Sequence, residues 1–208
     1  MRHKDEALLL VVDCTGHGVP GAFVTMLVKA LERNMIGYIK KTDEMVSPAK
    51  LLNVLNSSMK HLLRQEDKSS ESNAGLDAGI LYINKKEKIA RYAGAEIDLY
   101  YSEDGKIKRF KGDRQSIGYR NSKLDYEYHD HEIDLEKSRQ FFISTDGYID
   151  QNGGKKGFPL GRKQFQTILQ ENQDKSMSEL EALLLKELTL YQGDYEANDD
   201  ITVIGVSL

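Results

Sequence analysis

The sequence predicts an α+β protein in which helices lie outside packed β-sheets. Predicted strands cluster in the middle of the chain, predicted helices come in two pairs on either side, and we find no repeat or linker. Strands and helices that segregate in this way pack in layers around one core. We therefore expect a single domain over residues 1–208, which is long enough for a sizeable core.

The chain is predicted to begin with a buried strand and two helices. The apolar run at 7–12, "ALLLVV", has no polar alternation and predicts a buried strand. Pro20 is tolerated in a first helical turn, and a mostly apolar helix is predicted over 22–35. A second helix is predicted to start with Ser47 as N-cap and Pro48 at the first position. Its apolar residues fall on one stripe, namely Leu51, Leu55, Met59 and Leu62.

Strand patterns dominate the middle of the chain. "AGILYI" and "KIARYA", joined by "NKKE", predict one hairpin. "IDLYYS" and "KIKRFK", joined by "EDG", predict another in which Gly105 supplies a positive φ. The alternating stretch 123–135 predicts a strand with Leu124, Tyr126 and Tyr128 on one face. The low-complexity stretch 64–75 predicts a mobile loop between helix and sheet.

The C-terminal part returns to helices framed by strands. "QFFIST" predicts a buried strand, and "ITVIGVSL" predicts the closing strand. Between them, helices are predicted over 162–171 and 179–191, and the second opens with a capping box from Ser176 to Glu179.

Composition excludes several classes of protein. The net charge of −4 gives no general electrostatic reason to bind nucleic acid or an anionic membrane. The single cysteine, Cys14, excludes an internal disulfide and fits a reducing compartment. The longest apolar runs are too short to span a bilayer, and the N-terminus lacks signal-peptide architecture. We expect a cytoplasmic protein, with any membrane tether supplied by a region outside this sequence.

The turn "DCTGHGVPGAF", residues 13–23, follows the first strand and is rich in groups that do chemistry. A phosphate-binding loop would need Lys and then Ser or Thr after its second glycine, where Ala22 and Phe23 stand. A cysteine phosphatase would need an arginine six residues after Cys14, where Pro20 stands. These two chemistries are disfavoured.

Metal binding is better supported. Asp13, Asp146 and the pair Asp199–Asp200 each stand at the end of an apolar run. Carboxylates are ligands that Mg²⁺ and Mn²⁺ prefer. From these residues alone, scattered aspartates that form turns or cap helices remain an equal alternative.

Three motifs in order, "DCTGHGVPGAF", "STDGYID" and "NDDITVIGV", resemble those of metal-dependent serine/threonine protein phosphatases of type 2C. They are most similar to the bacterial SpoIIE/RsbU-like branch, and "GFPLGRKQF" resembles a segment of that branch. The first motif also resembles that of regulators of bacterial biofilm and aggregation. The resemblance spans residues 7–208.

The resemblance implies a four-layer αββα sandwich with a binuclear Mn²⁺ or Mg²⁺ centre. It implies that Asp13 bridges both metals, that the backbone carbonyl of Cys14 holds the second, and that Asp146 and Asp199 hold the first. The three aspartates would be catalytic through the water that the metals activate, which attacks phosphoserine or phosphothreonine. Turn or substrate roles are expected for Gly16, His17, Gly147 and Asp200.

The family's upstream "G-G-D" motif, whose acid is a further ligand of the second metal, has no counterpart before Ala7. We therefore expect a chain without the family's first strand or strands, as the C-terminal part of a longer sensor protein, with a weak second metal site. The expected substrate is a small STAS-type phosphoprotein in a partner-switching pathway. An upstream sensory domain and a homodimer are further expectations. The alternatives are a catalytically impaired phosphatase-fold binding module and a hydrolase of small phosphates.

Overall fold

The computed structural model describes residues 2–208 apart from residues 4, 17, 42–44 and 67–72. The chain divides into two compact units. The N-terminal unit comprises Met1–Ile97 and Lys111–Leu135, and the C-terminal unit comprises Asp98–Phe110 and Glu136–Leu208. Most of the loop predicted over 64–75 lies outside the described residues.

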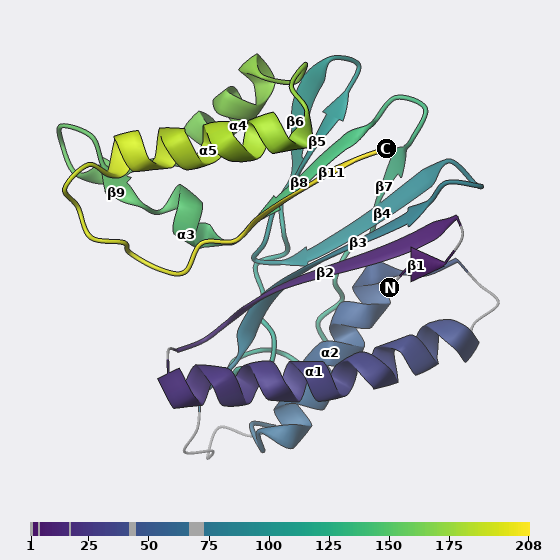
Figure 1. Ribbon diagram of the computed structural model, residues 1–208. Helices are drawn as coiled ribbons and strands as arrows, with labels where there is room; N and C mark the ends of the chain where they lie inside the picture. Colours follow the sequence, from purple (N-terminus) through teal and green to yellow (C-terminus); the bar gives the residue numbers. More distant parts are fainter. Residues whose placement is uncertain (1, 4, 17, 42–44, 67–72) are drawn as a thin grey trace. The chain divides into compact units, whose positions relative to one another are not determined.

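The N-terminal unit is an antiparallel sheet with the order β1-β2-β3-β4-β7, and helices α1 and α2 pack against it (Figure 1). The strands are β1 (Arg2–His3), β2 (Glu6–Cys14), β3 (Leu76–Asn84), β4 (Ile89–Ala95) and β7 (His131–Asp134). The helices are α1 (Gly18–Lys41) and α2 (Pro48–Leu62). The first predicted hairpin is therefore confirmed as β3–β4, and α1 is longer at both ends than its apolar pattern predicted.

The start of α2 confirms its predicted cap. The Ser47 side chain accepts a hydrogen bond from the backbone N–H of Lys50 at 3.1 Å, and Pro48 begins the helix. Asp130 adds a second cap, since its carboxylate accepts from the backbone N–H of Ala49 at 2.8 Å. Three of the four residues of the predicted stripe are buried, but Leu62, the last residue of the helix, is 47% exposed.

The predicted strand over 123–135 is wrong for most of its length. Only His131–Asp134 pairs with β4. Leu124 is exposed, whereas Tyr126 and Tyr128 pack with the core of the unit, 5.0 Å apart between ring centroids. Hydrogen bonds to a neighbouring loop replace the ladder, including one from the Tyr128 hydroxyl to the Gln115 carbonyl at 3.1 Å. The alternation reflects two tyrosines that anchor a loop.

The C-terminal unit is a four-stranded antiparallel sheet with the order β11-β8-β5-β6, against which α4 and α5 pack. The strands are β5 (Leu99–Glu103), β6 (Lys106–Phe110), β8 (Gln140–Ser144) and β11 (Val203–Ser207). A two-stranded ribbon joins β9 (Asn152–Gly153) to β10 (Phe158–Pro159). The helices are α3 (Asp146–Ile149), α4 (Arg162–Glu171) and α5 (Met177–Gln192).

The predicted turn between β5 and β6 and the predicted cap of α5 are confirmed in this unit. Gly105 has a φ of 74° in the β5–β6 turn, and Asp104 shares the left-handed conformation with a φ of 50°. The capping box that opens α5 is present between Ser176 and Glu179. The core is aromatic, with the fully buried Phe165 ring 5.1 Å from that of Tyr100.

Each unit is thus a sheet with helices packed against it, and the predicted α+β class is confirmed. Among the described residues, no helix combines the length and apolar character needed to cross a membrane.

Candidate metal centre

Asp13 is the second-last residue of β2, where it lies opposite Asp77 of β3 in the antiparallel register. The chain then turns sharply, with Gly16 at a φ of 89°. A Cβ atom on Gly21 would lie 2.5 Å from the Gly16 carbonyl oxygen, so the turn is folded tightly against the first turn of α1. Glycine is required at both positions. His17 lies outside the described residues.

Cys14 is half-buried, and burial raises the pKa of its thiol. A raised pKa leaves little of the thiolate form that a nucleophile requires. This electrostatic environment supports the exclusion of cysteine-phosphatase chemistry. The Cys14 backbone carbonyl is the group that remains of interest.

The other two candidate acids belong to the C-terminal unit. Asp146 is the first residue of α3 and follows the end of β8 after the N-cap residue Thr145. Asp199 lies in the exposed segment before β11. Its carboxylate accepts a hydrogen bond from the backbone N–H of Asp200 at 2.7 Å, which orients the side chain.

The segment before β11 is held close to the start of α3. The backbone N–H of Thr145 donates to the Thr202 carbonyl at 3.0 Å, and the backbone N–H of Thr202 donates to the Thr145 hydroxyl at 3.0 Å. A Cβ atom on Gly147 would lie 2.3 Å from the carbonyl oxygen of Asp200. Glycine at 147 therefore allows the backbone approach that brings the two acidic segments together.

Two amide side chains extend this clamp, and the sequence analysis assigned neither of them a role, although Asn198 opens the motif "NDDITVIGV". Gln151 is completely buried, and its Nε2 donates to the Glu196 carbonyl at 2.9 Å. Asn198 Nδ2 donates to the Asp150 carbonyl at 2.8 Å. Their position directly beside the acids Asp150 and Asp199 was the available signal, but a polar residue beside an acid is common in exposed loops.

The pKa of Asp146 indicates that other acids lie near it. Partial desolvation, together with the nearby carboxylates of Asp150 and Asp199, raises the pKa of Asp146, while Arg162 opposes the rise. Asp146 and Asp199 are therefore close enough to repel each other. A divalent cation would relieve this repulsion, and hard carboxylate oxygens are the donors that Mg²⁺ and Mn²⁺ take. These residues fit such a cation.

Within the described residues of either unit, no three His, Cys, Asp or Glu side chains form a group that could hold a metal ion. Asp13 belongs to the N-terminal unit, whereas Asp146 and Asp199 belong to the C-terminal unit. The ligand set that the sequence suggests thus draws on both units.

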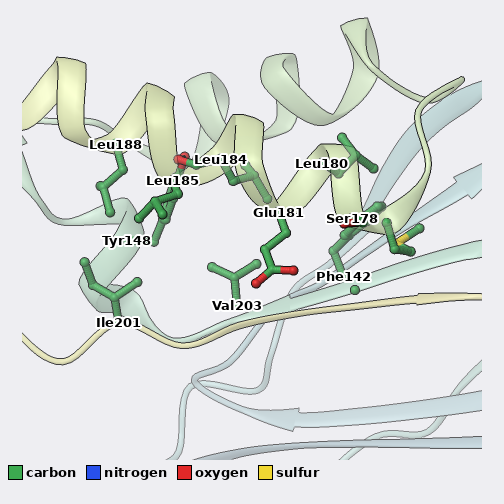
Figure 2. A pocket seen from close by; sticks show the side chains of 12 residues that line it. Phe142, Tyr148, Ser178, Leu180, Glu181, Leu184, Leu185, Leu188, Ile201 and Val203 are labelled. Carbon is green, nitrogen blue, oxygen red and sulfur yellow. The ribbon is translucent and has the colours of Figure 1, made fainter.

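An apolar groove in the C-terminal unit has a different character. It runs between α5 and strands β8 and β11, and Figure 2 shows the leucines of α5 facing Val203, with Ile201 near one end. Glu181 is the acid among its lining residues. This lining is not suited to the recognition of a phosphoryl group, which needs charge or directed hydrogen bonds.

Solved structures place this fold among the PP2C-type phosphatase domains. The SiaA-PP2C domain of Pseudomonas aeruginosa matches with a TM-score of 0.84 and 32% identity, over 100% of this chain and 78% of that one. The RsbU and RsbW domains of a Mycobacterium tuberculosis protein match with a TM-score of 0.68 and 19% identity, over 98% and 52%. RsbX in complex with magnesium matches with a TM-score of 0.62 and 19% identity, over 100% and 84%. The last two likenesses show the fold alone.

The family model described as stage II sporulation protein E (SpoIIE) matches residues 3–208. The chain belongs to the SpoIIE family, which confirms the resemblance found in its three motifs. Among curated proteins, none matches the sequence significantly.

Proposed function

We propose that this chain is a metal-dependent protein serine/threonine phosphatase that acts on a small regulatory phosphoprotein. Membership of the SpoIIE family supports a serine phosphatase. The observation that carries the proposal for this chain is the clamp that brings the exposed residues Asp146, at the start of α3, and Asp199, in the segment before β11, close together. Exposed acids are accessible both to metal ions and to a substrate as large as a protein.

In this proposal Asp13 and the Cys14 backbone carbonyl would be ligands of Mn²⁺ or Mg²⁺, and so would Asp146 and Asp199. Divalent cations supply Lewis acidity that activates water for attack on phosphorus and offsets charge on the phosphoryl oxygens. The backbone N–H of Asp200 fixes the orientation of the Asp199 carboxylate. Gly16 allows the tight turn after Asp13, and Gly147 allows the close approach of the Asp200 backbone to the start of α3. His17 is proposed to shape the first turn or meet the substrate.

The substrate is proposed to be a STAS-type phosphoprotein in a partner-switching pathway. RsbU and RsbW domains in a related structure support a regulatory phosphoprotein partner. The family match runs through both compact units, which supports the proposal that they make up one SpoIIE-like domain. An upstream sensory domain and a homodimer complete this proposal.

The test is release of inorganic phosphate from a serine-phosphorylated STAS protein in the presence of Mn²⁺, with an EDTA-treated sample and Asp146→Asn as controls. We expect release that needs the metal and is lost in the variant. Binding of the phosphoprotein without release would contradict the proposal and favour a phosphatase-fold binding module. Release from small phosphate esters but not from the phosphoprotein would overturn the proposed substrate class.

A further inference from the structure

The turn after Asp13 is fastened to the N-terminal unit through Thr15. The backbone N–H of Thr15 donates to the Gly75 carbonyl at 3.0 Å, and the Thr15 hydroxyl donates to the same oxygen at 2.8 Å. Both bonds end on the residue that precedes β3. Thr15 therefore sets where the backbone of residues 13 and 14 can lie.

Thr15 has a second partner, the hydroxyl of Tyr119, which contacts its Oγ1 atom. A threonine hydroxyl has one hydrogen, and that hydrogen is directed to the Gly75 carbonyl. Tyr119 is thus the donor in this contact. Burial, the largest cause, raises the pKa of Tyr119 although the contact with Thr15 opposes the rise, so the hydroxyl is protonated and can donate.

The Tyr119 ring has little freedom to move away from this contact. A Cβ atom on Gly75 would lie 2.4 Å from both the Tyr119 ring and the Ile117 carbonyl oxygen. Leu76 and Ile117 exchange two backbone hydrogen bonds, of 3.0 and 2.8 Å. The ring is therefore packed directly on the backbone that receives the Thr15 hydrogen bonds.

Buried polar side chains on and just after α2 hold the backbone around Tyr119. Lys60 is 2% exposed, and its ammonium donates to the Tyr119 carbonyl at 2.7 Å. Asn56 accepts from the backbone N–H of Gly118 at 2.9 Å, and Gln65 donates to the Gly118 carbonyl at 2.6 Å. Burying such groups is unfavourable unless they are hydrogen-bonded, and here their bonds fix one loop.

We propose that Tyr119 is a positioning residue for the metal centre. Its hydroxyl holds Thr15, and Thr15 in turn fixes the Asp13 carboxylate and the Cys14 carbonyl, the two ligands that this turn is proposed to supply. The inference rests on the proposed function. Loss of the hydroxyl leaves the ring packing intact but removes one of the three contacts that hold Thr15, so the two ligands are held less firmly for the metal.

The test compares Tyr119→Phe with Tyr126→Phe, which removes a hydroxyl that bonds to Asp113 at 3.2 Å in the same unit. We expect the Mn²⁺ dissociation constant, measured by calorimetry, to rise roughly fivefold to tenfold in Tyr119→Phe and to stay unchanged in Tyr126→Phe. The melting temperatures of the metal-free variants should agree closely. Thr15→Val should weaken Mn²⁺ binding as Tyr119→Phe does, and Thr15→Ser, which keeps the hydroxyl, should restore it.

Equal Mn²⁺ affinities in the two tyrosine variants would overturn the inference. Amide hydrogen exchange of Cys14 and Thr15 without metal gives an independent readout, and we expect it to be faster in Tyr119→Phe alone. Wild-type protein that binds no Mn²⁺ and releases no phosphate would overturn the proposed function. In that case the exchange rates alone decide whether Tyr119 positions the turn: unchanged rates refute it, and faster rates support it.

Discussion

Replacement of Gly147 by alanine should impair catalysis far more than stability. The added methyl would lie 2.3 Å from the Asp200 carbonyl oxygen, whereas ordinary contacts begin near 3.4 Å. Backbone lies on both sides of this contact, so no flexible side chain can move aside. The segment that carries Asp199 must shift away from the start of α3 by about 1 Å.

The cost in stability follows from the bonds that join these segments. The shift weakens the two hydrogen bonds between Thr145 and Thr202, each worth about 0.5–1.5 kcal/mol net. Alanine returns roughly 0.5–1 kcal/mol through its better helix propensity in α3. We therefore expect a net loss of at most about 2.5 kcal/mol, which lowers the melting temperature by no more than roughly 10 °C in a chain of this size.

The effect on activity should be larger, because a misplacement of about 1 Å in a catalytic group can lower the rate about 100-fold. Gly37→Ala is the matched control, since Gly37 lies in α1 with open space where the methyl would be added and should tolerate alanine without loss. The assays are phosphate release in Mn²⁺ and thermal unfolding without metal. Wild-type turnover in Gly147→Ala would refute the close approach of the two acidic segments.

Three further substitutions test other parts of the structure. Asp146→Asn should raise the Mn²⁺ dissociation constant at least tenfold in calorimetry. The melting temperature without metal should stay equal or rise, because repulsion from the neighbouring carboxylates falls. An unchanged Mn²⁺ affinity would contradict the assignment of Asp146 as a ligand. Asp199→Asn should abolish phosphate release, whereas Asp200→Asn, which keeps the backbone N–H, should retain most of it; equal losses would place the ligand register one residue off. Phe165→Ala should lower the free energy of unfolding, measured in urea, by about 3–5 kcal/mol, because the ring is fully buried and contacts the rings of two tyrosines. A loss below about 1 kcal/mol would contradict that packing.

Features that depend on neighbouring residues in the sequence could be predicted well. The Ser47 cap, the Ser176–Glu179 capping box and the Asp104–Gly105 turn each rest on contacts within four residues. The side chains and φ angles that stabilise them are properties of short segments. The element order followed from these signals, and with it the α+β class.

The loop over 123–130 could not be predicted in this way. Its alternating tyrosines match a strand, but a strand also needs a partner, and β4 pairs only with His131–Asp134. Tyr126 and Tyr128 instead find partners in the loop that contains Asp113 and Gln115. The alternating pattern predicts which side chains are buried. Whether the backbone that carries them is a strand or a loop depends on contacts with residues far away in the sequence.

In the candidate site, too, the residues with local sequence signals could be predicted and those with only distant contacts could not. The acids could be proposed because they stand at the ends of apolar runs, and family motifs gave them roles. The residues that hold the acids in place, such as Gln151, Lys60 and Tyr119, make their bonds across many positions in the sequence. A buried lysine or glutamine has no local sequence signature, because its type is common on surfaces.

The two acidic turns share one construction within their separate units. In each, an aspartate lies near the end of a strand or shortly after it, a glycine allows a close backbone contact, and buried polar side chains fix the backbone nearby. Metal ions and a protein substrate require exposed acids, and an exposed loop by itself is mobile. Buried residues such as Gln151 and Lys60 hydrogen-bond to the backbone near the acids and make it rigid, while Asp146 and Asp199 stay exposed and Asp13 stays partly exposed. Substitutions of these buried residues should therefore affect metal binding more than substitutions of exposed residues beside the acids.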